Sequence, residues 1–228
     1  MGPSSSTVEN YLKAIYQAQL RLPRRGDLVP MGQLAGALGV VPGTATTMVK
    51  ALAESGLVKY EPYGGVRLTA AGERLAALVV RRHRLIELFL VKVMGMSWID
   101  VHDEAENLEH AMSDRLVDRI DEMLGRPAVD PHGDPIPTRQ GEIVEASGQE
   151  SLAASPAGVP RFVARVIDQR ADFLRLVERH GLMPGRRVIV RTRDEVLDTI
   201  EIEPEDRESL RLGIRAASRI LVTATEDP

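Results

Sequence analysis

The 228-residue chain contains no cysteine, and this absence excludes several chemistries at once. Disulfide bonds, zinc–thiolate sites, iron–sulfur clusters and cysteine nucleophiles all need thiols. Aromatic residues are also scarce, at 4% of the chain, and they do not form a platform on which RNA bases would stack. Any metal ion bound by this chain is therefore held by oxygen and nitrogen donors, and the sequence does not favour RNA as a partner.

Long apolar runs and catalytic motifs are missing as well. No stretch approaches the about 20 apolar residues that a membrane-spanning helix needs, and the Ser-rich start lacks the apolar core of a signal peptide. We therefore expect no membrane partner and a cytoplasmic location. The sequence also lacks an HExxH motif, paired ExxH motifs on separate helices, a nucleophile elbow and a phosphate-binding loop. We predict that the protein is not an enzyme.

Charge is distributed unevenly along the chain. Residues 1–100 carry 12 basic and 7 acidic side chains, whereas residues 101–160 carry 4 basic and 13 acidic ones. Because DNA is a polyanion, a basic segment is the part expected to meet it. The N-terminal part is therefore the candidate DNA-binding region.

The pattern of this basic part predicts a helix-turn-helix. Apolar residues recur at spacings of three and four in 8–19, 31–38 and 44–54, which predicts three amphipathic helices. Pro42 suits the start of the third helix, and Gly56 suits the cap beyond its end. The second and third helices are separated only by a short glycine-containing break, which is typical of a DNA-binding helix pair.

A β-hairpin is predicted directly after this helix pair. Residues 57–61 and 66–69 alternate as strands, and Pro62-Tyr63-Gly64-Gly65 forms the turn between them. A hairpin at this position is a wing. In a winged helix the second helix of the pair enters the major groove, while basic residues of the wing reach phosphates or the minor groove. The predicted DNA-contacting residues are Thr44, Thr46, Thr47 and Lys50 on the helix and Lys59 and Arg67 on the wing.

Oxygen and imidazole donors converge in the acidic part. We predict one long helix from Thr69, its N-cap, to Met94 and a second from about Ser97 to Leu124. At about 100° per residue, four donors of the second helix fall within one quadrant to one third of its surface. Carboxylates and imidazoles in such a group suit divalent metal ions. These donors are His102, Glu106, Glu109 and His110.

Helix geometry divides the donors between two sites. A rise of about 1.5 Å per residue separates His102 from His110 by roughly 12 Å, which is too far for one ion. His83 and Glu87 are one turn apart on the preceding helix and could meet His102 across the helix pair. The remaining trio would form a second site that needs a further ligand from elsewhere. That trio is Glu106, Glu109 and His110.

A salt-bridged, solvated helix flank is the alternative, since 27% of the residues are charged. The apolar stripe of the same helix places the donors beside the buried face. Two like charges at Glu106 and Glu109 disfavour an isolated helix by a few tenths of a kcal/mol unless a cation lies between them. The pattern alone leaves both interpretations open. The stripe consists of Val101, Ala105, Leu108, Met112, Leu116 and Ile120.

The last part of the chain, from Arg126 onward, differs in composition from the helical parts before it. Prolines and small polar residues from Arg126 to Pro160 predict a linker. Beyond it, short β-like runs surround one helix, which fits a small β-barrel better than a helical domain. The runs are 162–167, 187–190, 199–202 and 220–223, and the helix is 172–180.

Over nearly its whole length the sequence resembles the metal-dependent regulators related to the diphtheria toxin repressor and the manganese-transport regulators. The matching stretches are ENYLKAIY, GLVKYEPYGGVRLTAAG, RRHRLIELFL, VHDEAENLEHAMSDRL and DPHGDPIP. The resemblance implies a mainly α fold with β structure. Its expected parts are a winged-helix DNA-binding domain at 1–72, a helical metal-binding and dimerisation domain at 73–140, a linker at 141–160, and an SH3-like (FeoA-like) small β-barrel at 161–228.

The resemblance also implies which residues bind metal at a primary site. Glu106, Glu109 and His110 match three of its ligands. Asn10, on the first helix, occupies the position where relatives carry Met or Asp. It offers a neutral amide oxygen, and neighbouring Glu9 could substitute for it.

An ancillary site is implied as well. Relatives complete it with Glu and Gln from the SH3-like domain, where Arg170 and Phe173 align in this chain. Asp172 is the nearest plausible replacement. The other residues that match the ancillary site are His83, Glu87 and His102.

We therefore predict a metal-dependent transcriptional regulator of manganese or iron homeostasis, a repressor that binds double-stranded operator DNA as a homodimer. Glu106 stands where iron-responsive relatives carry Cys and manganese-responsive ones carry Glu. Because carboxylate oxygen suits hard ions, Mn(II) is the expected metal, with Fe(II) as the alternative and other divalent ions able to bind in vitro. Lys13 stands where a Glu helps build a two-metal cluster in the short manganese regulators, so two separated sites are expected. The rival functions are a metal-independent winged-helix regulator and a metal-dependent enzyme.

Overall fold

The computed structural model describes residues 5–22, 24, 26–144 and 147–225, and the chain divides into two compact units. Unit 1 holds the residues up to His83 together with Glu109–Ala111 and Pro137–Ile143. Unit 2 holds Arg84–Leu108, Met112–Ile136 and the chain from Val144 onward. Among the described helices, none combines the length and apolar character needed to cross a membrane.

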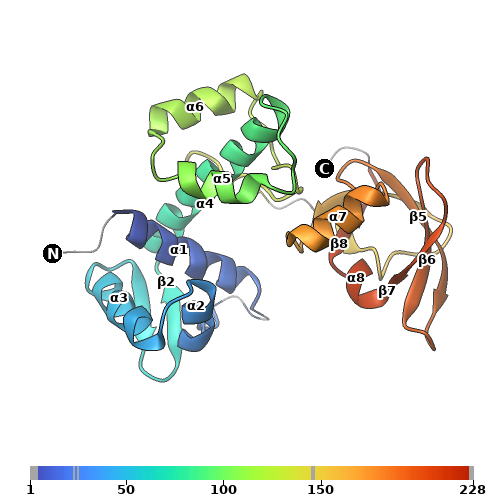
Figure 1. The fold of residues 1–228 in the computed structure, drawn as a ribbon. Coiled ribbons are helices and arrows are strands. Elements are labelled where there is room, and N and C mark those ends of the chain that lie inside the picture. Colours follow the sequence, from blue (N-terminus) through green and yellow to red (C-terminus); the bar gives the residue numbers. More distant parts are fainter. Residues whose placement is uncertain (1–4, 23, 25, 145–146, 226–228) are drawn as a thin grey trace. The chain divides into compact units, whose positions relative to one another are not determined.

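Unit 1 is a winged helix (Figure 1). Gly39, with φ 63°, turns the chain between the first two helices of the motif, and Pro42 lies in the first turn of the second. Gly56, with φ 72°, ends that helix, as the sequence predicts. The elements are α1 (Ser5–Leu20), α2 (Met31–Ala37), α3 (Pro42–Glu54), β1 (Val58–Glu61), β2 (Gly65–Leu68) and the first part of α4 (Ala70–Lys92).

One apolar core holds these elements together. Leu12 and Ile15 of α1 pack with Leu34 of α2 and Val49 of α3, and none of the four is more than 1% exposed. Burying each such side chain stabilises the fold by about 1.5–3 kcal/mol. Thr69 caps α4, because its Oγ1 accepts a hydrogen bond from Gly72 N at 3.2 Å. The shared core fixes α1 to α3.

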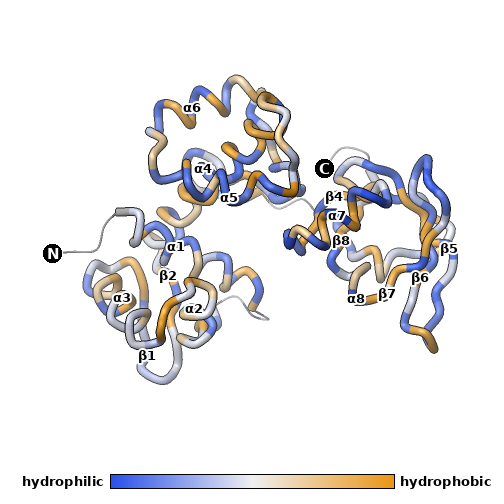
Figure 2. The backbone as a smooth tube through the Cα atoms, viewed as in Figure 1, coloured by the Kyte–Doolittle hydropathy of each residue, from blue (hydrophilic) through white to orange (hydrophobic). Residues whose placement is uncertain are grey.

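The helical part of unit 2 differs from the prediction. The single helix expected from about Ser97 to Leu124 is wrong, because the structure has two helices, α5 (Val101–Leu108) and α6 (Asp114–Met123). Ser113 begins α6 as its N-cap, and its side chain accepts a hydrogen bond from Leu116 N. Hydrophobic and hydrophilic residues alternate along α6 (Figure 2). Its buried side includes Val117 and Ile120, which pack on the last part of α4.

The strands of unit 2 form one antiparallel sheet in the order β3-β8-β4-β5-β6-β7 (Figure 1). The SH3-like domain is therefore present, but its sheet is open rather than a closed barrel, since β3 and β7 are its two edges among the described strands. The elements are β3 (Glu150–Ser151), β4 (Pro160–Val166), α7 (Ala171–Arg179), β5 (Arg187–Asp194), β6 (Thr199–Pro204), β7 (Leu210–Gly213), α8 (Ile214–Ala217) and β8 (Ile220–Thr223).

Part of the segment expected to be a linker at 141–160 belongs to this sheet. Glu150 and Ser151 pair with Val222 and Leu221 of β8. Leu152 is 0% exposed and lies in the core of the sheet. Because Leu152 is buried directly after β3, this part of the segment is anchored to the sheet. Its prolines and small polar residues mark turns and not a flexible linker.

Candidate metal centres and DNA-reading face

The first cluster of donors lies in unit 1, around Glu109. Lys13 of α1 donates hydrogen bonds from Nζ to both carboxylate oxygens of Glu109, at 3.0 and 2.8 Å. His83 of α4 approaches the same carboxylate, with Nδ1 2.7 Å from Oε2. Glu109 is 0% exposed and Lys13 is 5% exposed. From the sequence, Lys13 indicates only that two separated sites replace a two-metal cluster, whereas the structure places its charge against a predicted ligand.

These neighbours decide the charge of Glu109. Burial raises the pKa of a carboxyl group, but the hydrogen bond from His83 and the charges of Lys13 and His83 outweigh it, so the pKa of Glu109 lies below its ordinary value. The carboxylate is ionised at neutral pH. A buried, ionised carboxylate is a strong ligand for a divalent cation, provided that Lys13 gives way to it.

His110 contacts both Asn10 and Glu9, the two candidates for the remaining ligand of the primary site. Its Nδ1 is 2.6 Å from Glu9 Oε2, and its Nε2 is 2.7 Å from Asn10 Oδ1. The Nε2 atom also lies 3.4 Å from Glu109 Oε1. One ring nitrogen thus faces Asn10 and Glu109, and the other faces Glu9 alone.

Arg82 holds the turn that carries these residues. Its Nη1 donates to the backbone carbonyl of Glu109 at 2.9 Å and lies 3.5 Å from Glu9 Oε2. The sequence prediction did not include Arg82. It faces α1 and the 109–111 turn together, so it positions the cluster although it cannot bind a cation itself.

The other predicted ligands belong to unit 2. Glu87 Oε1 lies 3.2 Å from His102 Nδ1, and His102 Nε2 lies 3.6 Å from Glu106 Oε1. Of the residues expected at the ancillary site, Glu87 and His102 belong to unit 2, whereas His83 belongs to unit 1 and contacts Glu109 there. Of the residues expected at the primary site, Glu109 and His110 belong to unit 1 and Glu106 belongs to unit 2.

A second cluster in unit 2 was not predicted. One ligand atom from each of Glu87, Asp130 and His132 lies within 4.8 Å of the others, and all three residues are buried. His132 Nδ1 is 4.0 Å from Glu87 Oε2 and 4.0 Å from Asp130 Oδ1. The stretch DPHGDP enters the sequence prediction only through the family resemblance, because a histidine in a proline-rich loop shows no helical or strand periodicity.

The tautomer of His132 follows from its neighbours. His132 Nε2 lies 2.8 Å from the carbonyl oxygen of Trp98, which can only accept, so Nε2 carries the proton. With the proton on Nε2, the neutral form of the ring presents a lone pair at Nδ1. His132 is 1% exposed, and within the described residues this Nδ1 has no hydrogen-bond partner. A lone pair that faces two carboxylates is an arrangement that a cation stabilises.

The carboxylates of this cluster are unequal. Burial, followed by the neighbouring charges of Asp134 and Glu87, raises the pKa of Asp130 well above its ordinary value. Arg84 opposes this only in part, with Nε 3.6 Å from Asp130 Oδ2 and Nη2 3.8 Å from Asp134 Oδ2. The cluster therefore has an excess of acidic groups over basic ones.

Asp172, the expected ligand from the SH3-like domain, lies apart from this cluster. It is exposed at the start of α7, and its Oδ1 accepts a hydrogen bond from the backbone of Phe173 at 2.9 Å. The groups of possible metal ligands found among the described residues do not include it. Asp172 has the geometry of a helix-start residue, so the cluster at Glu87 is formed without it.

The predicted DNA-contacting residues lie together in unit 1. Thr44, Thr47 and Lys50 are exposed along α3. The hydroxyl of Thr47 donates to Gly43 O at 3.0 Å, which leaves its oxygen lone pairs available to DNA donors. On the wing, Lys59 is directly opposite Arg67 in the hairpin register. Thr46 is half-buried, and its hydroxyl donates to Pro42 O at 2.8 Å.

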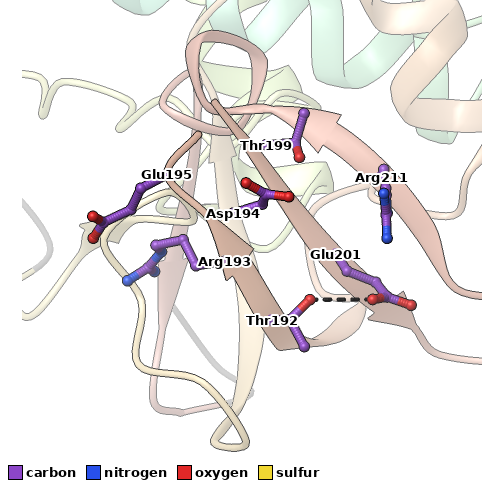
Figure 3. A pocket seen from close by; sticks show the side chains of 7 residues that line it. All are labelled: Thr192, Arg193, Asp194, Glu195, Thr199, Glu201 and Arg211. Carbon is purple, nitrogen blue, oxygen red and sulfur yellow. Dashed lines mark hydrogen bonds between the residues drawn. The ribbon is translucent and has the colours of Figure 1, made fainter. Parts of the chain in front are cut away.

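A hollow of about 320 Å³ lies on the face of β5, β6 and β7 (Figure 3). Thr192 Oγ1 donates to Glu201 Oε2 at 3.1 Å, and Glu201 is opposite Arg211 in the strand register. The hollow mixes both charges on an exposed sheet and contains no histidine. We assign it no part in metal binding.

Comparison with known families accounts for all three parts of the chain. Residues 4–66 match the iron dependent repressor, N-terminal DNA binding domain, and residues 69–138 match the iron dependent repressor, metal binding and dimerisation domain. Residues 151–224 match the FeoA domain. The last match begins at residue 151, which agrees with the place of β3 in the sheet.

Individual relatives agree with these matches. The iron-dependent repressor IdeR of Mycobacterium tuberculosis is 32% identical over 82% of this chain and 84% of the relative. The diphtheria toxin repressor of Corynebacterium jeikeium is 29% identical over 97% of this chain and 86% of the relative. A solved manganese-dependent transcriptional repressor in complex with manganese is 40% identical, with a TM-score of 0.84 over 96% of this chain and 100% of that one. The chain therefore belongs to the family of iron-dependent repressors that includes the diphtheria toxin repressor.

Proposed function

We propose that the protein is a metal-dependent transcriptional regulator that binds operator DNA as a homodimer when Mn(II) or Fe(II) occupies its sites. The observation that carries this proposal is the buried lone pair of His132, which faces the carboxylates of Glu87 and Asp130. Family membership supports the DNA-binding and dimerisation parts of the proposal, since the matching domains are described in those terms.

The unit 2 site would be held by Glu87, Asp130 and His132, with His102 beside Glu87. A histidine that binds metal through one nitrogen usually donates its other N–H to a carbonyl or carboxylate, as His132 does to Trp98. The carboxylates supply negative charge that matches a divalent ion. Glu87 is shared between His102 and His132, so one carboxylate could serve a site on either side of it.

The unit 1 site would be held by Asn10, Glu109 and His110. Glu106, the further ligand that the family resemblance implies, belongs to unit 2. The Nε2 atom of His110 faces Asn10 and Glu109, whereas Nδ1 faces Glu9. The same rule for histidine ligands assigns metal binding to Nε2 and a hydrogen bond to Glu9 from Nδ1–H. Asn10 is then the ligand, and Glu9 positions the ring.

Mn(II) is the ion that this donor set favours, with Fe(II) as the alternative. All donors are carboxylate or amide oxygens and imidazole nitrogens, and the chain has no thiol. Hard oxygen donors suit both ions. Zn(II) and other later first-row metals bind such donors more tightly, so selectivity for Mn(II) or Fe(II) depends on site geometry and on which ions are available. The relatives include proteins named for iron and for manganese.

A bound ion supplies positive charge and coordination bonds that join residues of separate segments. Asn10 lies on α1, and Glu109 and His110 lie on the turn that Arg82 anchors. Because α1 packs in the same core as α3, a fixed α1 holds the reading helix at a defined place relative to that turn. A dimer must present its two reading helices about 34 Å apart, so DNA binding falls when they are not held.

A metal-independent regulator is the second candidate, and the Lys13–Glu109 ion pair favours it. The pair already neutralises a predicted ligand without a metal ion. In that case calorimetry would detect no metal binding at the unit 1 site, and DNA affinity would be the same in chelator and in metal.

The decisive experiment measures DNA binding with and without metal. Duplexes are selected from a random-sequence pool with the full chain in Mn(II), and their affinity is then measured by fluorescence anisotropy in Mn(II), Fe(II) and chelator. We expect an affinity about 5- to 150-fold higher with metal. Equal affinities in metal and chelator would contradict the proposal. His110→Ala and His132→Ala should each reduce the metal response, while His180→Ala, at the C-cap that follows α7, is the matched control.

A further inference from the structure

We propose that Tyr63, at the tip of the β1–β2 wing, enters the minor groove of bound DNA and reads an A·T base pair there. The inference rests on the proposed DNA-binding function and adds a residue that was not among the predicted DNA contacts. It is carried by the exposure of Tyr63, by its backbone conformation and by the rigid attachment of the wing to the reading domain.

Tyr63 is the most exposed tyrosine in the structure. Its relative exposure is 109%, whereas that of Tyr11 is 5%. Tyr16 and Tyr60 are partly buried and pack against the core of unit 1. Tyrosine rings normally bury much of their apolar area and leave only the hydroxyl in water. A ring that is wholly in water contributes nothing to the packing of the wing, so the fold does not account for it.

The backbone of Tyr63 is strained as well. Its φ is 64°, in the left-handed region that favours glycine. The next residue is Gly64, so the turn already contains a residue suited to such a conformation. A side chain that packs against nothing and strains its turn is not explained by stability. Residues of this kind concentrate at sites of binding and catalysis.

The wing is fixed to the domain that carries the reading helix. Val29 N donates to Val66 O at 2.8 Å, and Val66 N donates to Val29 O at 3.0 Å. At Gly65 a Cβ atom would lie only 2.4 Å from Val29 O, so this close approach requires glycine. Val66 belongs to the same apolar core as Val49 of α3. The tip therefore has a defined position relative to α3.

Two positive charges on the hairpin, Lys59 and Arg67, favour its binding to the DNA backbone. Lys59 and Arg67 are opposite each other in the register, so their side chains lie on one face of the hairpin behind the tip. With α3 in a major groove, these cations face the adjacent phosphates. The residue that extends beyond a phosphate-bound hairpin meets the neighbouring minor groove. Figure 1 shows this hairpin, in cyan, beside α2 and α3.

The chemistry of the ring indicates which base pairs fit. The minor groove is about 6 Å wide in B-DNA, so a flat ring fits edge-on. Both A·T orientations present only acceptors there, at adenine N3 and thymine O2, and the Tyr63 hydroxyl can donate to either. A G·C pair adds the guanine N2 amino group, which obstructs the ring. We therefore expect a preference for A·T at the base pair under the wing tip.

The test compares Tyr63→Gly, Tyr63→Phe and Lys59→Ala with the unaltered protein, using the duplex selected in Mn(II). Tyr63→Gly should lower DNA affinity by at least about fivefold, while its melting temperature stays equal or rises because the strain is relieved. The slope of log affinity against log salt should not change, since no phosphate contact is lost. Lys59→Ala should reduce that slope by about 1. Tyr63→Phe should have an intermediate affinity, because it keeps the ring but lacks the hydroxyl that donates to adenine N3 or thymine O2.

A change in the DNA completes the experiment. Replacing the A·T pair under the tip by G·C should weaken the unaltered protein, and an I·C pair should restore its binding, because inosine lacks the 2-amino group but keeps the major-groove face of guanine. Tyr63→Gly should be insensitive to all three pairs. If Tyr63→Gly bound DNA with the affinity of the unaltered protein, the inference about Tyr63 would be overturned and the proposed function would not. A loss in Tyr63→Phe as large as that in Tyr63→Gly would also overturn it, because the ring would then contribute nothing in the groove. Failure of the unaltered protein to bind any selected duplex would overturn the proposed function itself.

Discussion

Lys13 and Glu109 form a buried ion pair in which the lysine ammonium donates to both oxygens of the carboxylate, at 3.0 and 2.8 Å. The two residues come from α1 and from the turn after α5, so the pair joins the same two segments that a bound ion would join. Lysine thus acts as an internal cation at the unit 1 site. A metal ion that binds Glu109 has to replace this interaction, which raises the metal concentration needed for occupancy.

Replacing Lys13 should make the protein depend more strongly on metal. In Lys13→Met the buried Glu109 loses two hydrogen bonds and the opposite charge of Lys13, which should destabilise the metal-free protein by about 3 kcal/mol. Mn(II) can then compensate the charge without competition. Differential scanning fluorimetry should show a lower melting temperature in chelator and a larger increase on adding Mn(II) than in the unaltered protein.

The double variant Lys13→Met with Glu109→Gln provides the control. It removes the charge as well as its partner, so it should be more stable in chelator than Lys13→Met and should gain little from Mn(II) at this site. If Mn(II) raised the melting temperature of Lys13→Met no more than that of the unaltered protein, Lys13 would not compete with metal.

The two faces of the His110 ring predict different effects for its two neighbours. Asn10→Asp adds a charge beside Nε2 and should raise Mn(II) affinity by about tenfold, because ligand charge tunes the affinity of oxygen-rich sites. Glu9→Gln weakens the hydrogen bond at Nδ1 and should lower Mn(II) affinity by about tenfold. A positioning residue is expected to have this partial effect, whereas loss of a ligand would abolish binding. Calorimetry on a His132→Ala background measures this site alone. Complete loss of binding in Glu9→Gln, with no gain in Asn10→Asp, would identify Glu9 as the ligand instead.

The sole tryptophan reports on the unit 2 site. The Trp98 and His132 rings lie 5.3 Å apart, and the Trp98 carbonyl accepts from His132. Paramagnetic Mn(II) bound by His132 should therefore quench Trp98 fluorescence in a saturable titration. His132→Ala should remove the quenching, and His180→Ala should not. Quenching that persists in His132→Ala would place the ion elsewhere.

The sequence predicted the winged helix closely, because its signals are local. Pro42 and Gly56 mark helix ends, and the turn residues from Pro62 to Gly65 mark the hairpin. The break between α5 and α6 was missed because the apolar spacing runs on across it, through Leu108 and Leu116. Both of these residues are more than a third exposed in the structure. The signal that could have shown the break is Ser113, a typical N-cap residue.

The metal clusters were only partly predictable for a different reason. His102, Glu106, Glu109 and His110 were found because a helical repeat groups them. His132 has no such repeat, and its partner Glu87 is distant in sequence, so only the fold brings them together. The role of Lys13 was equally hidden. An ion pair between α1 and a turn cannot be inferred from the spacing of either segment.

Asp168 provides a test of pH dependence away from the proposed metal sites. The hydrogen bond from Arg170 lowers the pKa of Asp168, partial burial opposes this, and the charges of Arg170 and Arg219 lower it further. An aspartate whose pKa is lowered by folding stabilises the protein fully above the unfolded-state pKa of about 3.9, and this contribution is lost as the pH falls through the folded-state value. Asp168→Asn should therefore destabilise unit 2 by about 1 kcal/mol at pH 7. Urea unfolding followed by Trp98 fluorescence should show the difference between the two proteins unchanged from pH 7 to pH 5 and shrinking toward pH 3. Asp198→Asn, which makes the same charge change on the exposed β5–β6 turn, is the control, and a difference that stays constant down to pH 3 would contradict the assignment.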